Sequence, residues 1–124
     1  MEIRFKIPPA VLGQTRHGTT RGAMQAHAVK VAAERKMARE ASEAAMREYG
    51  WETALGDVVL DISVVMKDRR RDFCNLMLVM KPLIDGMQDA GVMRNDKQIV
   101  EVNMVLDGYS KRYHGISVQV SKAD

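Results

Sequence analysis

The chain has 124 residues, which suits one domain of ordinary size and leaves little room for a second. Its composition, 46% hydrophobic and 28% charged, excludes a disordered or fibrous protein, and its net charge of +3 does not by itself indicate a nucleic-acid-binding protein. No apolar run approaches the roughly 20 residues of a membrane helix, and the single cysteine, Cys74, excludes an internal disulfide. We therefore expect a soluble, cytoplasmic domain spanning residues 1–124, with no membrane partner.

The first half of the chain predicts a strand, a long helix and a second strand. Residues 2–7 alternate polar and apolar side chains, which is typical of a half-buried strand. Residues 21–49 are rich in strong helix formers, and Gly50 is expected to end this helix. Its Ala-rich apolar stripe, expected to begin at Val29, would let a neighbouring element pack closely. Residues 57–66 contain a β-branched run that indicates a central strand.

The second half predicts a helix and two further strands. Asp72 is a typical N-cap residue, and apolar residues follow it at spacings of three and four as far as Met87. Pro82 lies inside this pattern and should kink or split the helix, because it removes a backbone donor. Residues 100–106 and 116–120 both alternate, and the turn-forming residues between them predict an antiparallel hairpin.

The resulting order of elements is strand, helix, strand, helix, strand, strand. This order predicts an α/β (α+β) fold, in which one two-layer domain has a small mixed sheet with two helices on one face. The sequence shows no internal repeat and no linker that would divide the domain.

Positive charge is concentrated in two short segments. Residues 1–22 contain four basic residues and one acidic residue, as do residues 67–71, so these segments hold all of the excess positive charge. A phosphate backbone is a natural partner for such a distribution, although two solvated loops would show the same pattern. Lys111 and Arg112, between the last two predicted strands, either extend this surface or solvate the end of a hairpin. The candidate DNA contacts are Lys67, Arg69, Arg70, Arg71, Arg16 and Arg21.

The stretch from residue 67 to 98 also holds candidate metal ligands. Asp72 opens the predicted helix and Asp96 lies in the loop after it, so only a helix break or a packing return could bring them together. Two carboxylates near arginines would suit Mg²⁺ beside a phosphate, because hard cations prefer oxygen ligands. On local grounds alone, Asp72 caps its helix and Asp96 is a turn residue. Asp85 lies four residues after Lys81, which predicts a helical ion pair.

Four short motifs follow one another within residues 68–99. They are Asp68-Arg69-Arg70-Arg71-Asp72-Phe73-Cys74-Asn75-Leu76, Lys81-Pro82-Leu83-Ile84-Asp85, Asp89-Ala90-Gly91-Val92 and Asn95-Asp96-Lys97-Gln98-Ile99. This ordered set resembles the signature of RusA-type Holliday junction resolvases. That family shows a basic run, Asp-x-Asp-Asn-Leu, a lysine and a helix, then Ala-Gly, a short loop, Asp-Asp-x-Gln and a valine-rich strand. The order of strands and helices agrees with the family over the whole length.

The resemblance implies a small homodimeric endonuclease, commonly of phage or prophage origin, that acts in DNA recombination and repair. Such an enzyme nicks four-way junctions symmetrically with Mg²⁺, for which Mn²⁺ can substitute. Asp72 and Asp96 match family aspartates and are implied to be catalytic metal ligands. Lys81 matches the catalytic lysine by its Lys-Pro context, and Asn75 matches the asparagine of the first motif, where we expect it to contact DNA.

Two departures from the family pattern bear on activity. Cys74 stands where the family has its second aspartate, and a thiol is a poor partner for Mg²⁺, so the metal site would lose a carboxylate. Three extra residues separate Asn75 from Lys81, and Lys81 reaches the family position only if a bulge before Pro82 absorbs them.

We therefore expect a Mg²⁺-dependent endonuclease for four-way junctions, with activity weakened by Cys74. One alternative is a protein of the same fold that binds junction or duplex DNA but has impaired catalysis. A third possibility is a protein-binding module whose basic loops are incidental; its behaviour towards DNA would not depend on salt.

Overall fold

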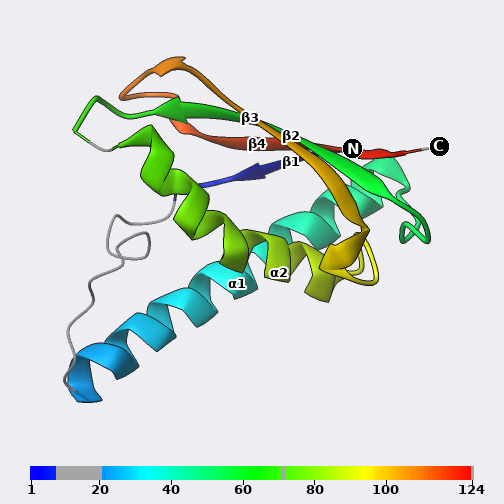
Figure 1. Cartoon of the computed structure of the whole chain (residues 1–124), viewed down its shortest axis with the longest axis horizontal. Helices are drawn as coiled ribbons and strands as arrows, with labels where there is room; N and C mark the ends of the chain where they lie inside the picture. The colour runs from blue at the N-terminus through cyan, green and yellow to red at the C-terminus, as the bar shows by residue number, and fades with distance from the viewer. Residues whose placement is uncertain (8–20, 71, 124) are drawn as a thin grey trace.

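The computed structural model describes residues 1–7, 21–70 and 72–123, and within these ranges four strands form one mixed sheet with the helices on one of its faces (Figure 1). The elements in chain order are β1 (Glu2–Phe5), α1 (Arg21–Tyr49), β2 (Val58–Met66), the 3-10 helix η2 (Phe73–Val79), α2 (Met80–Ala90), the 3-10 turn η3 (Asp96–Gln98), β3 (Ile99–Tyr109) and β4 (Gly115–Lys122). The predicted fold class is confirmed. None of the helices in the described part of the chain has both the length and the apolar character that crossing a membrane requires.

The sheet has the strand order β1-β4-β2-β3, so the predicted hairpin is wrong. Strands β3 and β4 are consecutive in the chain, but β2 lies between them, parallel to β3 and antiparallel to β4. The expected turn at Asp107-Gly108 is part of β3 instead. A register shift there pairs Leu106 with Val64 and Gly108 with Val65, which leaves Asp107 as a bulge. The chain leaves the sheet at Ser110, whose N–H donates to the carbonyl of Met66 (2.8 Å), and crosses the end of β2.

The core lies between the sheet and the helices. Strand β2 buries alternate residues from Val58 to Met66, as a central strand with one face on the helices should. Helix α2 contributes Met80, Leu83 and Met87, at the predicted spacing of three and four. The other face of the sheet carries mostly polar side chains and is open to solvent.

Pro82 splits the predicted helix rather than merely bending it. The segment after Asp72 is a 3-10 helix, and the α-helix begins at Met80, so Pro82 lies in the first turn of α2. A first-turn position suits proline, because the amide N–H that it lacks would have no helical partner there.

The two α-helices approach each other closely at one point. Gly86 of α2 lies against α1, and a Cβ atom placed on it would be 2.5 Å from both the Cβ of Ala38 and the carbonyl oxygen of Arg35. Beside this contact, Arg35 forms a two-pronged ion pair with Asp89 (2.6 and 2.8 Å). The predicted stripe on α1 is wrong at its start: Val29 is 69% exposed, because the first turns of α1 extend away from the sheet (Figure 1).

Candidate functional site

Asp72 is the N-cap of η2, as the sequence predicts. One of its carboxylate oxygens accepts a hydrogen bond from the amide of Cys74 (2.9 Å), and its carbonyl accepts one from the amide of Asn75 (3.1 Å). The side chains of Cys74 and Asn75 are exposed. Cys74 and Asn75 therefore face solvent, while Asp72 already has a structural role as a helix cap.

Lys81 joins two parts of the ordered motif set. Its ammonium nitrogen lies 2.8 Å from Oδ2 of Asp96 and 3.0 Å from Oδ1 of Asp85. Asp85 is the i,i+4 partner that the sequence predicts. Asp96 belongs to the chain that returns past the first turn of α2, which is the packing return that a shared site requires. We call Lys81, Asp85 and Asp96 the Lys81 cluster.

Gln98 holds Asp96 in place. Its side-chain oxygen accepts hydrogen bonds from the backbone amides of Arg94 (2.8 Å) and Asn95 (2.9 Å), which completes a capping box around η3. Its side-chain nitrogen donates to the carbonyls of Ala54 (2.9 Å) and Gly56 (2.6 Å). The glutamine of the last motif thus anchors the Asp96 loop to the segment before β2, a positioning role that the sequence analysis missed.

The charges of the Lys81 cluster stabilise one another. The hydrogen bond from Lys81 lowers the pKa of Asp96, and the hydrogen bonds to Asp96 and then Asp85 raise the pKa of Lys81. Near neutral pH the cluster therefore presents an ammonium between two carboxylates at an exposed position.

Asp72 and Cys74 do not join the Lys81 cluster. They lie at the start of η2 and Lys81 lies just beyond its end, and a 3-10 helix of seven residues is about 14 Å long. Among residues 1–7, 21–70 and 72–123, no three His, Cys, Asp or Glu side chains gather as metal ligands do. The donor chemistry of Asp85 and Asp96 nevertheless fits Mg²⁺, which commonly uses one or two carboxylates together with waters and substrate phosphates.

Basic side chains from three segments gather at one end of the sheet. Met66 at the end of β2 pairs with Tyr109 at the end of β3, and β4 begins beside them with Gly115 opposite Val65. The end of β1 lies there too, because Phe5 pairs with Ile116. We call this group the basic end; it consists of Lys6, Lys67, Arg69, Arg70, Lys111 and Arg112, all exposed.

The residues of the basic end are not the same as the predicted DNA contacts. Lys111 and Arg112 belong to it because the loop after β3 crosses the end of β2. Arg21 does not, since it begins α1, whose first turns extend away from the sheet (Figure 1). The predicted contacts Arg16 and Arg71 lie outside the described residues. Asp68 is the acidic neighbour, and it accepts a hydrogen bond from the amide of Arg70 (2.9 Å).

Comparison with known proteins does not add a family to this geometry. No model of a protein family matches the chain, and no curated protein matches it.

Proposed function

We propose that this protein is a Mg²⁺-dependent, structure-specific DNA endonuclease that nicks four-way junctions in the cytoplasm as a homodimer. The observation that carries the proposal is the Lys81 cluster, in which Lys81 lies within 3.0 Å of carboxylates from two separate motifs. Two carboxylates and a lysine at an exposed position are the groups that metal-assisted phosphodiester hydrolysis requires.

Each residue of the cluster has a role in this proposal. Asp85 and Asp96 would hold Mg²⁺, which supplies a water of lowered pKa and neutralises charge on the attacked phosphate. Lys81, which lies beside both carboxylates, would donate hydrogen bonds to a phosphate oxygen and so orient the strand. Gln98 keeps Asp96 at a fixed place beside Lys81.

The basic end supports DNA as the substrate. The basic end lies at the Met66 end of β2. Asp96 lies near the opposite end of this strand, because Ile99, which follows Asp96 closely in the chain, pairs with Val58. A nine-residue strand spans about 26 Å, because each of its eight steps advances about 3.3 Å. One duplex turn is about 34 Å, so a single DNA arm is long enough to contact both the basic end and the Lys81 cluster.

The exposed edge of the sheet supports the homodimer. Strand β3 has no neighbour on its outer side among the residues that the structure describes, and Val100 (57%), Val102 (49%) and Val105 (53%) are exposed along it. Residues 99–106 contain no lysine or proline, the residues that usually protect such an edge. A two-fold dimer would present two equivalent sites to a two-fold symmetric junction. We expect light scattering to show a dimer; a monomer with and without DNA would remove the basis for paired nicks.

The test is a cleavage assay on a labelled mobile four-way junction with Mg²⁺ or Mn²⁺. We expect paired symmetric nicks, and we expect Asp96→Asn to abolish them without weakening junction binding. Asp89→Asn is the matched control, because Asp89 is an exposed carboxylate of α2 that binds Arg35 instead of Lys81. Absence of nicking by the unmodified protein in both metals would refute the proposal.

Asp72→Asn tests the ligand set that the family resemblance implies. A loss as complete as that of Asp96→Asn would make Asp72 a ligand, and would mean that η2 rearranges on DNA. Unchanged nicking would assign the metal to Asp85 and Asp96.

One observation favours a second candidate, a junction-binding protein with impaired catalysis. The carboxylate of Asp72 is used as a helix cap, and the exposed Cys74 follows at the position of the second family aspartate. This candidate predicts tight, salt-sensitive junction binding without nicks in either metal.

A further inference from the structure

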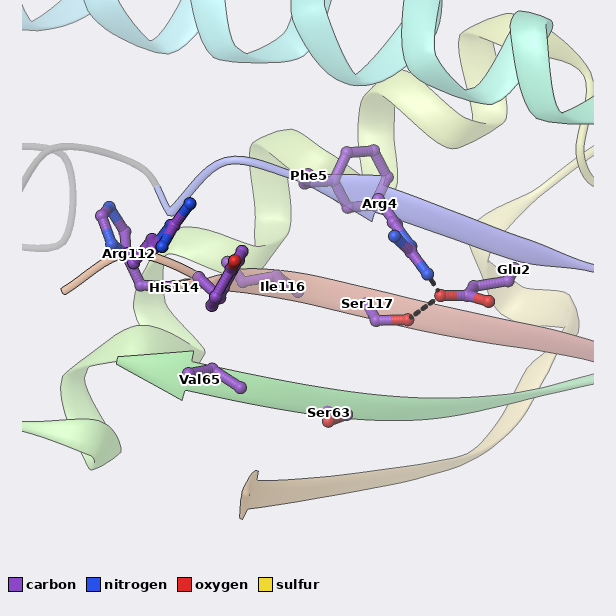
Figure 2. Close-up of a pocket in the computed structure, with 11 residues that line it drawn as sticks. Glu2, Arg4, Phe5, Ser63, Val65, Arg112, His114, Ile116 and Ser117 are labelled. Atoms are coloured by element: carbon purple, nitrogen blue, oxygen red, sulfur yellow. Dashed lines mark hydrogen bonds and ion pairs between the residues drawn. The ribbon is translucent and has the colours of Figure 1, made fainter. Parts of the chain in front are cut away.

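A pocket lies on the open face of the sheet, at the side of the basic end. It has a volume of about 430 Å³, within the range of small-ligand sites, and Figure 2 shows its lining from β1, β2, β4 and the loop before β4. Gly115 creates part of the hollow, because it pairs with Val65 on this face and has no side chain of its own. The pocket lies on the opposite face of the sheet from the helices.

The two ends of the pocket differ in their charge. At one end Glu2 accepts hydrogen bonds from Arg4 and Ser117 (both 2.9 Å), so the charges of Glu2 and Arg4 satisfy each other (Figure 2). At the other end lie Arg112 and His114 (Figure 2). Arg112 forms no salt bridge with any residue that the structure describes, so its guanidinium remains available to an anion.

An exposed tyrosine lies beside this available charge. Tyr113, 72% exposed, lines the pocket, and the guanidinium of Arg112 lies 5.3 Å from the centre of its ring. Aromatic rings interleaved with arginines are the features on which the bases of single strands stack, because every base has an available face once it is unpaired.

We infer that this pocket binds an unpaired nucleotide of DNA, with the base stacked on Tyr113 and the phosphate held by Arg112. The inference rests on the proposed function for DNA as the partner, and deepens it by assigning the pocket to the unpaired part of a branched substrate. Paired bases in a duplex offer no face to Tyr113, so the pocket distinguishes single strands from duplex, whereas the basic end contacts both.

The test compares binding of a fluorescent oligothymidylate with binding of a blunt duplex of equal length, by anisotropy in EDTA so that cleavage plays no part. We expect Tyr113→Ala to weaken single-strand binding about five-fold or more and duplex binding less than two-fold. Tyr113→Phe should bind like the unmodified protein, because the stacking surface is kept. Tyr49→Ala is the matched control, since Tyr49 is also exposed (53%) but lies at the end of α1.

The outcomes separate this inference from the proposed function. Equal weakening of single strand and duplex by Tyr113→Ala, or no weakening, would overturn the inference, as would failure of the unmodified protein to bind the single strand. A protein that nicks no junction but shows the selective Tyr113 effect would refute the endonuclease and support the pocket. Tyr113 is 72% exposed, so we expect its variants to fold as the unmodified protein does. The melting temperature of each variant, measured alongside, checks this.

Discussion

The contact between α1 and α2 gives the most quantitative prediction, for Gly86→Ala. In an isolated helix this change would stabilise by about 1 kcal/mol, because alanine is the better helix former. Here the added Cβ would lie 2.5 Å from the Cβ of Ala38, 2.5 Å from the carbonyl oxygen of Arg35 and 2.8 Å from the amide nitrogen of Arg39. Ordinary contacts lie at about 3.5–4.0 Å, so the helices must separate by roughly 1 Å.

The steric cost of the added Cβ outweighs the gain from the higher helix propensity of alanine. Two of the three close atoms belong to the backbone of α1 and cannot move aside by changing a rotamer. Overpacking of this kind costs about 3 kcal/mol at the upper end of its usual range, so we expect a net loss of about 2 kcal/mol in the free energy of unfolding. For a domain of this size that corresponds to a fall of roughly 8 °C in Tm.

Thermal and urea unfolding followed by circular dichroism measure this loss. Gly22→Ala is the matched control, because it places a Cβ on α1 with no described atom within 4 Å, and it should be neutral or slightly stabilising. Adding Ala38→Gly to Gly86→Ala should restore only part of the stability, since the clash with Arg35 remains. A Gly86→Ala protein as stable as the unmodified one would refute the close helix contact.

Three further predictions concern the metal, the DNA and pH. Cys74→Asp should leave junction nicking unchanged in both Mg²⁺ and Mn²⁺, because position 74 lies at the far end of η2 from the Lys81 cluster; gel analysis of nicked junctions measures this. Replacing Arg69 and Arg70 by Ala should weaken binding to every DNA shape and flatten the salt slope by about 2 in a gel-shift titration. Arg35 lowers the pKa of Asp89, so Asp89→Asn should lower stability at neutral pH, and this difference should vanish as the pH falls through that lowered pKa, which urea unfolding across pH measures.

Each of these predictions has a result that contradicts it. A rise in nicking on Cys74→Asp would mean that position 74 reaches the metal when DNA is bound. The control for the DNA prediction is Lys30→Ala with Lys36→Ala, which removes two exposed charges from α1. If this control changed the salt slope as much as the replacement of Arg69 and Arg70 does, the basic end would have no special role. A stability difference for Asp89→Asn that persists in acid would mean that the carboxylate acts through something other than its charge.

Local patterns predicted the elements well because each has a strong local cause. The first helix has the predicted bounds, and Gly50 follows it with φ of 64°, a backbone conformation that glycine adopts readily. The alternation along β2 and the capping role of Asp72 are likewise properties of short segments. The pairing of β3 was mispredicted because Asp107-Gly108 suits a turn and a bulge equally, and only the presence of β2 beside it decides between them.

The candidate site was predictable in its residues but not in its grouping. The ordered motifs pointed to Lys81 and Asp96, and these two form an ion pair. The sequence predicts the ion pair between Lys81 and Asp85, but it does not reveal that Asp96 shares the same ammonium, because this depends on how the chain packs against α2 after it ends. It also does not reveal that Asp72 lies at the far end of η2, because this depends on where the proline divides the helix. Arg112 belongs to the basic end because of the order of the strands in the sheet, and no local sequence pattern predicts that order.

The central place of β4 in the sheet has a consequence for how the protein folds. Among the described strands β4 is the last to be made, yet it is the only described neighbour of β1, and the backbone of Met1 exchanges hydrogen bonds with that of Val120 (2.9 and 2.8 Å). Until residues 115–122 leave the ribosome, one edge of β2 stays unpaired and β1 has no partner, so the sheet cannot close during synthesis. Such long-range pairing slows folding, and it leaves an apolar strand open to aggregation in chains that terminate early.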